Sequence, residues 1–268
     1  MQYSQFYLVA WALLASLFLW LSTAAGASLA FFTTRLEQKL LDFSMGFAGG
    51  LMFAISTWSL LQPALEMSND YGVWKWFPAG TGFALGAACL YYVDLLVPRL
   101  QLSAPDKPAK GLPSSLRRAT LLTLAITVHN IPEGIAVGAI FGALADATSR
   151  ISPANAIALT IGLSLHKVVE GAAVALPLVR EGMTSKQSFW YGQSTAAVGP
   201  GAALVGVMAT SSAQPILPYA MGFAASAMIY VAVREIIPET QGSGNPLVAG
   251  MAFMLGYAVM MILDVSLG

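Results

Sequence analysis

Long apolar runs recur along the whole chain, and each is long enough to cross a lipid bilayer as a helix. Crossing about 30 Å of hydrocarbon takes roughly 20 residues at 1.5 Å per residue. Only 10% of the 268 residues are charged, whereas 57% are hydrophobic. A water-soluble surface of ordinary charge density cannot be built from this composition. We therefore predict an all-α polytopic membrane protein, a single domain over residues 1–268, with eight transmembrane helices at about 7–32, 43–65, 77–97, 119–144, 152–179, 188–211, 215–238 and 246–267.

The distribution of Lys and Arg predicts how these helices are oriented. Short cytoplasmic loops carry an excess of Lys and Arg. With the N-terminus outside, only Lys75 and Arg150 fall in outer loops. The inner loops then hold nine basic residues: Arg35, Lys39, Arg99, Lys107, Lys110, Arg117, Arg118, Arg180 and Lys186. We predict a multi-pass plasma-membrane protein with both termini outside and residues 98–118 as a cytoplasmic loop.

Few ionisable residues lie deep within the predicted spans. Each such group costs several kcal/mol unless it is paired, hydrated or bound to an ion. The fourth span holds His129 and Glu133, and the fifth holds His166, Lys167 and Glu170. Both histidines of the protein are in this set, and each is followed four residues later by Glu and then Gly, in "HNIPEG" and "HKVVEG".

The spacing within these two motifs favours a metal site. Residues four apart lie on one face of a helix, so each His–Glu pair forms an edge with two ligands. The two spans are adjacent and antiparallel, which places both edges near the bilayer midplane. Two imidazoles and two carboxylates suit Zn²⁺ and neighbouring divalent ions. The alternative is that each pair only stabilises helix packing, but two matched pairs at one depth favour the metal site.

Proline and glycine residues beside "HNIPEG" predict local features of the fourth span. Pro132 has no N–H for the Val128 carbonyl, so we expect a kink that leaves this oxygen free. Gly134, Gly138 and Gly142 recur every four residues and predict a surface on which another helix packs closely.

Two classes of function explain these motifs poorly. An intramembrane metal-dependent hydrolase needs a metal-bound water, a general base and an open coordination position. The chain has no "HExxH" motif, and neither histidine has a Glu beside it. A purely structural protein or a receptor leaves the duplicated motif unexplained. The motifs therefore favour a metal site that does not belong to an enzyme, and they indicate no organic cofactor. The zero net charge and the absence of a basic run give no indication of nucleic-acid binding.

The motifs resemble those of a known family. "HNIPEG" and "HKVVEG", with "GGLMFAISTWSLLQPALE" in the second span and "REIIPETQ" in the seventh, resemble the ZIP (Zrt/Irt-like) divalent-metal transporters, in particular the GufA-like bacterial branch. The resemblance implies a 3+2+3 helix arrangement with pseudo-symmetric repeats, homodimers and a bacterial inner membrane. It also implies import of a substrate metal, Zn²⁺ above all and also Cd²⁺, Fe²⁺, Mn²⁺ or Co²⁺, by alternating access at a midplane site between helices four and five.

Carried over by position, the resemblance also implies a ligand set. Its primary members are His129, Glu133, His166 and Glu170. Met52 matches a thioether ligand, although it is also a common packing residue. Asn130 is a further candidate ligand, secondary to the four primary ones. GufA-like relatives hold a second metal through this Asn and two acidic positions, which here are Lys167 and Gly199. We therefore predict one metal, with the Lys167 ammonium in place of the second ion. The alternative is that Lys167 extends along its helix to the membrane surface.

Polar residues near the span ends suggest a path for the ion. Ser59 and Asp264 lie toward the outer ends of spans two and eight and predict an outer vestibule. Glu235, Glu239 and Asp94 lie toward the inner ends of spans seven and three and would receive the ion on the cytoplasmic side. The alternative for each is a side chain that only faces water or headgroups.

Overall fold

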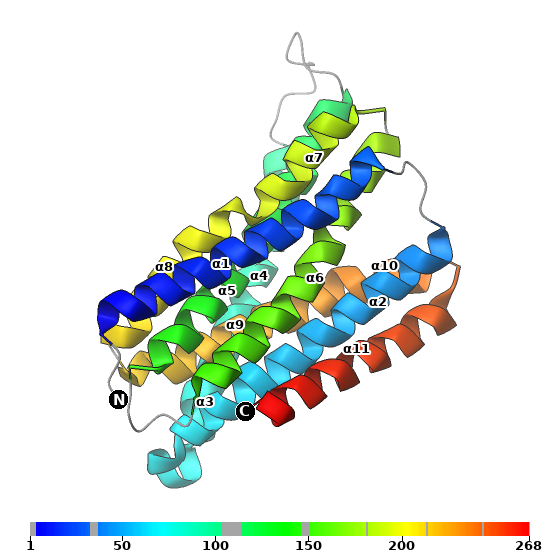
Figure 1. Cartoon of the computed structure of the whole chain (residues 1–268). Coiled ribbons are helices and arrows are strands. Elements are labelled where there is room, and N and C mark those ends of the chain that lie inside the picture. Colours follow the sequence, from blue (N-terminus) through cyan, green and yellow to red (C-terminus); the bar gives the residue numbers. More distant parts are fainter. Residues whose placement is uncertain are drawn as a thin grey trace.

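The computed structural model describes residues 4–32, 37–102, 114–145, 151–180, 182–212, 214–242 and 244–267. Within these ranges the chain is almost wholly helical, and its helices lie side by side in one bundle (Figure 1). Consecutive elements join into eight rods: α1 (Gln5–Ala27) with η1 (Ser28–Phe31); α2 (Gln38–Ala54), η2 (Ile55–Leu61) and α3 (Gln62–Met67); α4 (Trp76–Leu102); α5 (Ser114–Ala143); α6 (Pro153–Arg180); α7 (Ser185–Ser194), η4 (Thr195–Val198) and α8 (Gly199–Ser212); α9 (Leu217–Val231), η6 (Ala232–Ile236) and α10 (Ile237–Gly242); and α11 (Pro246–Leu267). Short 3₁₀ turns, η3 (Asn69–Trp74) and η5 (Gln214–Ile216), precede α4 and α9.

Each predicted span falls on one of these rods, and the predicted all-α membrane fold is confirmed. In the described residues, five helical stretches are long and apolar enough to cross a membrane by length and composition: Gln5–Phe31, Gln38–Met67, Pro153–Val179, Leu217–Arg234 and Pro246–Ser266. The other three rods are α4, α5 and α7–α8, which coincide with the third, fourth and sixth predicted spans. The first rod begins and the last rod ends at the same end of the bundle (Figure 1), as an even number of spans requires.

Glycines hold the rods together in four close pairs. At these glycines a Cβ atom would overlap the backbone of the neighbouring helix, so only Gly permits the observed approach. Representative contacts are Gly26 with Val168 (α1–α6), Gly50 with Phe253 (α2–α11), Gly82 with Tyr219 (α4–α9) and Gly138 with Ala203 (α5–α8). The α4–α9 contacts advance in the same direction along both helices, since Gly86 lies against Phe223 one turn further on.

The glycine stripe beside "HNIPEG" is the α5 side of the α5–α8 pair. Gly134 lies against Gly199 and Gly142 against Thr210, with Gly138 between them. The predicted close helix packing is therefore present, and it brings the start of α8 up to the ionisable residues of α5.

The rods fall into two groups that follow from these pairs. One group contains α1, α5, α6 and α7–α8, and the other contains α2–α3, α4, α9–α10 and α11. Figure 1 shows α1 and α8 together on one side of the bundle and α2 and α11 together on the other. Contacts of α5 with α9 and of α2 with α6 join the groups.

The second rod and the seventh rod share an interruption, which is consistent with the predicted pseudo-symmetric repeats. Each contains a π-helical segment, η2 or η6, just before a proline near the start of a short helix. Pro63 and Pro238 cannot bond the carbonyls of Ser59 and Arg234, and their rings crowd these oxygens. In a π-helical segment the hydrogen bonds join residues five apart, and this wider turn accommodates the proline ring. In contrast, α5 remains an α-helix through Pro132, so the kink expected there stays a prediction.

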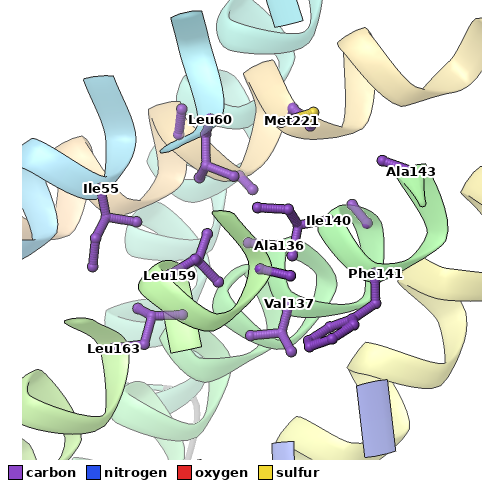
Figure 2. Packing of buried hydrophobic residues seen from close by; sticks show 14 of the residues in the cluster. Ile55, Leu60, Ala136, Val137, Ile140, Phe141, Ala143, Leu159, Leu163 and Met221 are labelled. Carbon is purple, nitrogen blue, oxygen red and sulfur yellow. The ribbon is translucent and has the colours of Figure 1, made fainter. Parts of the chain in front are cut away.

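Part of the largest hydrophobic core lies on one side of the ionisable residues. It packs side chains of η2, α5, α6 and α9 against one another, including Ile55, Leu60, Ala136, Val137, Ile140, Phe141, Leu159, Leu163 and Met221 (Figure 2). On α5 these residues follow Glu133, and on α6 they precede His166. We call these nine residues, each at most 4% exposed, the aliphatic seal.

Candidate metal site

Helices α5 and α6 bring three potential metal ligands together in the interior. Nε2 of His166 lies 3.5 Å from Oε1 of Glu133 and 3.4 Å from Oε2 of Glu170. One ligand atom from each residue falls within 4.8 Å of the other two. Glu133 and His166 are only 4% and 6% exposed. Two carboxylates and an imidazole at these separations match the donor set of a divalent transition metal.

The other two predicted donors border the same space. His129 lies one turn before Glu133 on α5, and Met52 approaches from α2 with 1% exposure. Both line the cavity that the three-residue cluster faces. The structure thus brings Glu133, His166 and Glu170 within ligand distance of one another, and it places His129 and Met52 around them in the cavity wall.

Lys167 turns into the site and not toward the membrane surface. Its side chain is 3% exposed, and its ammonium contacts the carboxylates of both Glu133 and Glu170. It also donates to Oδ1 of Asn130. The alternative in which Lys167 extends to the surface is therefore wrong. The two carboxylates act as counter-charges there, because a buried ammonium must be paired.

Asn130 connects Lys167 to the cluster and to α7–α8. Its Nδ2 donates to Oε1 of Glu170 at 2.9 Å and to the backbone carbonyl of Thr195 at 2.8 Å. Its Oδ1 accepts from Lys167. Oδ1 is the atom that an amide offers to a metal. The Lys167 ammonium therefore lies where an ion bound to Asn130 would lie.

The position at which the resemblance predicts a second acidic residue lies beside this ammonium. Gly199 begins α8 directly after the 3₁₀ segment η4. It borders a small space together with Asn130, Glu133 and Lys167. A Cβ atom at Gly199 would meet nothing within 4 Å, so a side chain has room there.

A cavity of about 340 Å³ extends from the cluster toward one end of the bundle. Its walls come from the first half of α2, the part of α5 before Glu133, the second half of α6 and the end of the α9 rod. At the far end, Leu41 and Pro177 are partly exposed. On the opposite side of the cluster, the aliphatic seal fills the bundle.

The structure describes the side chains of only two of the five residues that were predicted to line the path of the ion. Oγ of Ser59 donates to Oδ1 of Asp264 at 2.7 Å, so these two residues do meet. They are 2% and 9% exposed, and their role in an outer vestibule stays a prediction. The side chains of Asp94, Glu235 and Glu239 lie outside the described residues.

The sequence alone did not reveal two contributors. The Thr195 carbonyl bonds to Asn130 from η4, the 3₁₀ segment in this rod. The "GPG" with which α8 begins was a usable signal of that irregularity. Met45 lines the cavity, and its position seven residues before Met52 places it on the same face of α2.

The sequence matches known proteins over most of its length. A family model described as ZIP Zinc transporter matches residues 102–264. The chain is 39% identical to "Zinc transporter ZIP11" of Homo sapiens, and the alignment covers 96% of this chain and 97% of that protein. The chain belongs to the ZIP family.

Bacterial members of the ZIP family are also similar over most of their length. "Zinc transporter GufA" of Myxococcus xanthus is 30% identical, with 96% of this chain and 98% of that protein covered. "Zinc transporter ZIPB" of Bordetella bronchiseptica is 32% identical, with 92% and 78% covered. The predicted family is confirmed, and the GufA-like resemblance is consistent with these matches. Divalent-metal transport is the activity of this membrane protein family, and these relatives are transporters and not enzymes.

Proposed function

We propose that this ZIP protein imports Zn²⁺ into the cytoplasm, and that Cd²⁺, Fe²⁺, Mn²⁺ and Co²⁺ are further substrates. The observation that carries the proposal is the buried cluster of Glu133, His166 and Glu170 at the closed end of a cavity. His129 and Met52 complete the ligand set from the same cavity wall. The names of the relatives, all zinc transporters, support Zn²⁺ as the main substrate.

The site holds one metal ion at a time in this proposal. Two dications about 4 Å apart repel four times as strongly as two unit charges, whereas an ammonium beside a dication repels it half as strongly as a second dication does. Lys167 already contacts one oxygen each of Glu133 and Glu170. Glu133 therefore keeps Oε1 for the metal, whereas Oε1 of Glu170 also accepts a hydrogen bond from Asn130 and offers the metal its second lone pair. Asn130 then positions Glu170 and Lys167 and does not itself bind the ion.

Lys167 also explains how the site tolerates being empty. When the ion leaves, two buried carboxylates without a counter-ion would be costly at this depth. The ammonium remains bound to both of them, so the unloaded protein retains a paired charge. This pairing favours a carrier that returns empty after it releases its metal.

Alternating access follows from the asymmetry around the site. With the orientation predicted from Lys and Arg, the cavity opens toward the cytoplasm and the aliphatic seal faces outside. Import then requires a second conformation, in which the seal opens and the cavity closes. We propose that the α1, α5, α6 and α7–α8 group moves against the other rods between these two states, as one group of helices does in transporters with inverted repeats.

Metal flux into proteoliposomes tests the proposed function. Purified protein should carry Zn²⁺ inward at a rate proportional to protein, and empty liposomes should show only leak. Each of the five ions is tested separately, so that the substrate range is measured on one preparation. Absence of protein-dependent flux for every ion would overturn the proposal.

Orientation, membrane and oligomeric state need their own measurements. We propose a homodimer in a bacterial inner membrane with both termini outside. Cys89 is the single cysteine of the sequence. In a Cys89→Ser background, Ser4→Cys should react with a membrane-impermeant maleimide in intact cells, whereas Ser103→Cys should react only after lysis. The reverse result would invert the orientation. The mass of the detergent-solubilised protein, corrected for bound detergent, measures the oligomeric state.

A further inference from the structure

The walls of the cavity change character between the metal cluster and the exposed end. Around the cluster, the wall carries His129, Met52 and the carboxylates. Beyond it, among the described residues that line the cavity, the side chains are Leu41, Ala48, Ile126, Ala173, Val174, Pro177, Val231, Ile236 and Met45. Met45 is the one member of this outer set whose side chain offers a donor atom to a metal.

Helix α2 places Met45 between the cluster and the cavity end. Met45 and Met52 are seven residues apart, which is two helical turns and about 10.5 Å along one face. Because α2 begins at Gln38, Met45 lies nearer the exposed end. Met52 is 1% exposed, whereas Met45 is partly exposed. An ion that leaves the carboxylates toward this end passes Met45.

The chemistry of a thioether makes this position selective. A thioether sulfur is soft and polarizable, and it binds soft cations better than hard ones. Cd²⁺ therefore gains from such a contact, whereas Mn²⁺, which prefers oxygen ligands, gains little. In a wall that is otherwise aliphatic, the described side chains offer no carboxylate that would mask the difference.

We propose that Met45 is a second thioether contact for the transported ion, and that it promotes passage of soft divalent cations between the metal site and the exposed end of the cavity. The inference rests on the proposed function, because it requires metal to move through this cavity. It makes Met45 a residue that determines specificity, distinct from the ligands of the central site.

Substitution of Met45 by Leu tests the proposal, because Leu keeps the volume and apolar character and removes only the sulfur. Cd²⁺ flux should fall roughly three- to tenfold relative to wild type, whereas Mn²⁺ flux should stay unchanged. The number of Cd²⁺ ions bound per chain should also stay the same, since the central ligands are intact. Met251→Leu is the matched control, because Met251 is 73% exposed on α11 and does not line the cavity.

The outcomes separate this inference from the function on which it rests. If wild type carries Cd²⁺ and Mn²⁺ but Met45→Leu leaves their flux ratio unchanged, the role of Met45 is overturned and the transport function stands. An equal loss for both ions also overturns it, because that result indicates a general packing defect. If wild type carries no ion, the proposed function fails and the inference fails with it.

Discussion

The two sides of the metal cluster differ in how the same helices pack. After Glu133, the α5 side chains Val137 and Ile140 are completely buried in the aliphatic seal (Figure 2). Before Glu133, Ile126 and His129 are partly exposed and line the cavity. Both sides are built mostly from apolar residues. On the sealed side, η2 and α9 pack against α5 and α6, and on the cavity side a space remains between the helices. Helix packing, and not the polarity of the side chains, therefore sets access to the site.

The largest expected change in transport comes from substituting a ligand of the metal cluster, which lies between the cavity and the seal. Glu133→Gln keeps the size of the side chain and removes its charge, so the cluster loses one carboxylate ligand and Lys167 loses one partner. Zn²⁺ flux into proteoliposomes should fall by at least about 100-fold, a loss above the range seen when residues that only support a metal site are changed. Glu37→Gln, at an exposed position before α2, should retain wild-type flux. Retention of flux by Glu133→Gln would mean that the ion does not pass through this cluster.

Chemical labelling sharpens the contrast between cavity and seal. In a Cys89→Ser background and without metal, Ala173→Cys lies in the cavity wall, whereas Ala136→Cys lies in the seal, where Ala136 is 0% exposed. A small water-soluble thiol reagent should modify the first at least about ten times faster, because local opening must precede reaction at a fully buried position. Bound Zn²⁺ should slow reaction at Ala173→Cys. Equal rates at the two positions would show that the sealed side opens as readily as the cavity.

The smallest expected effect is a change in the number of metal ions that bind at the metal cluster. Lys167→Asp combined with Gly199→Glu removes the ammonium and supplies two carboxylates, and Gly199 has space for a side chain. Equilibrium dialysis against Zn²⁺ should give about two ions per chain for the double variant and about one for wild type, because bridging carboxylates offset the repulsion between dications. Lys167→Asp alone serves as the intermediate control. Two tight sites in wild type would contradict the single-metal proposal.

Much of this molecule was predictable because the relevant constraints are local. The length of the apolar runs predicted the rods, and spacing by four predicted that His166 and Glu170 share a face. The close contact between Gly138 and Ala203 also follows a sequence pattern, although the identity of the partner helix does not. The direction of Lys167 was not predictable, because surface and site were both within reach of its long side chain. Its burial depends on two carboxylates and Asn130, which come from two helices.

The sequence by itself determined a membrane bundle with two His–Glu edges at one depth, since helical periodicity and bilayer thickness act on each segment separately. Tertiary structure decided the rest. It placed Glu133, His166 and Glu170 within ligand distance, turned the ammonium of Lys167 into the cluster and brought the Thr195 carbonyl to Asn130. It also sealed one side of the site and left a cavity on the other. These features depend on which helices touch and at what separation, and that is a property of packing between segments far apart in the chain.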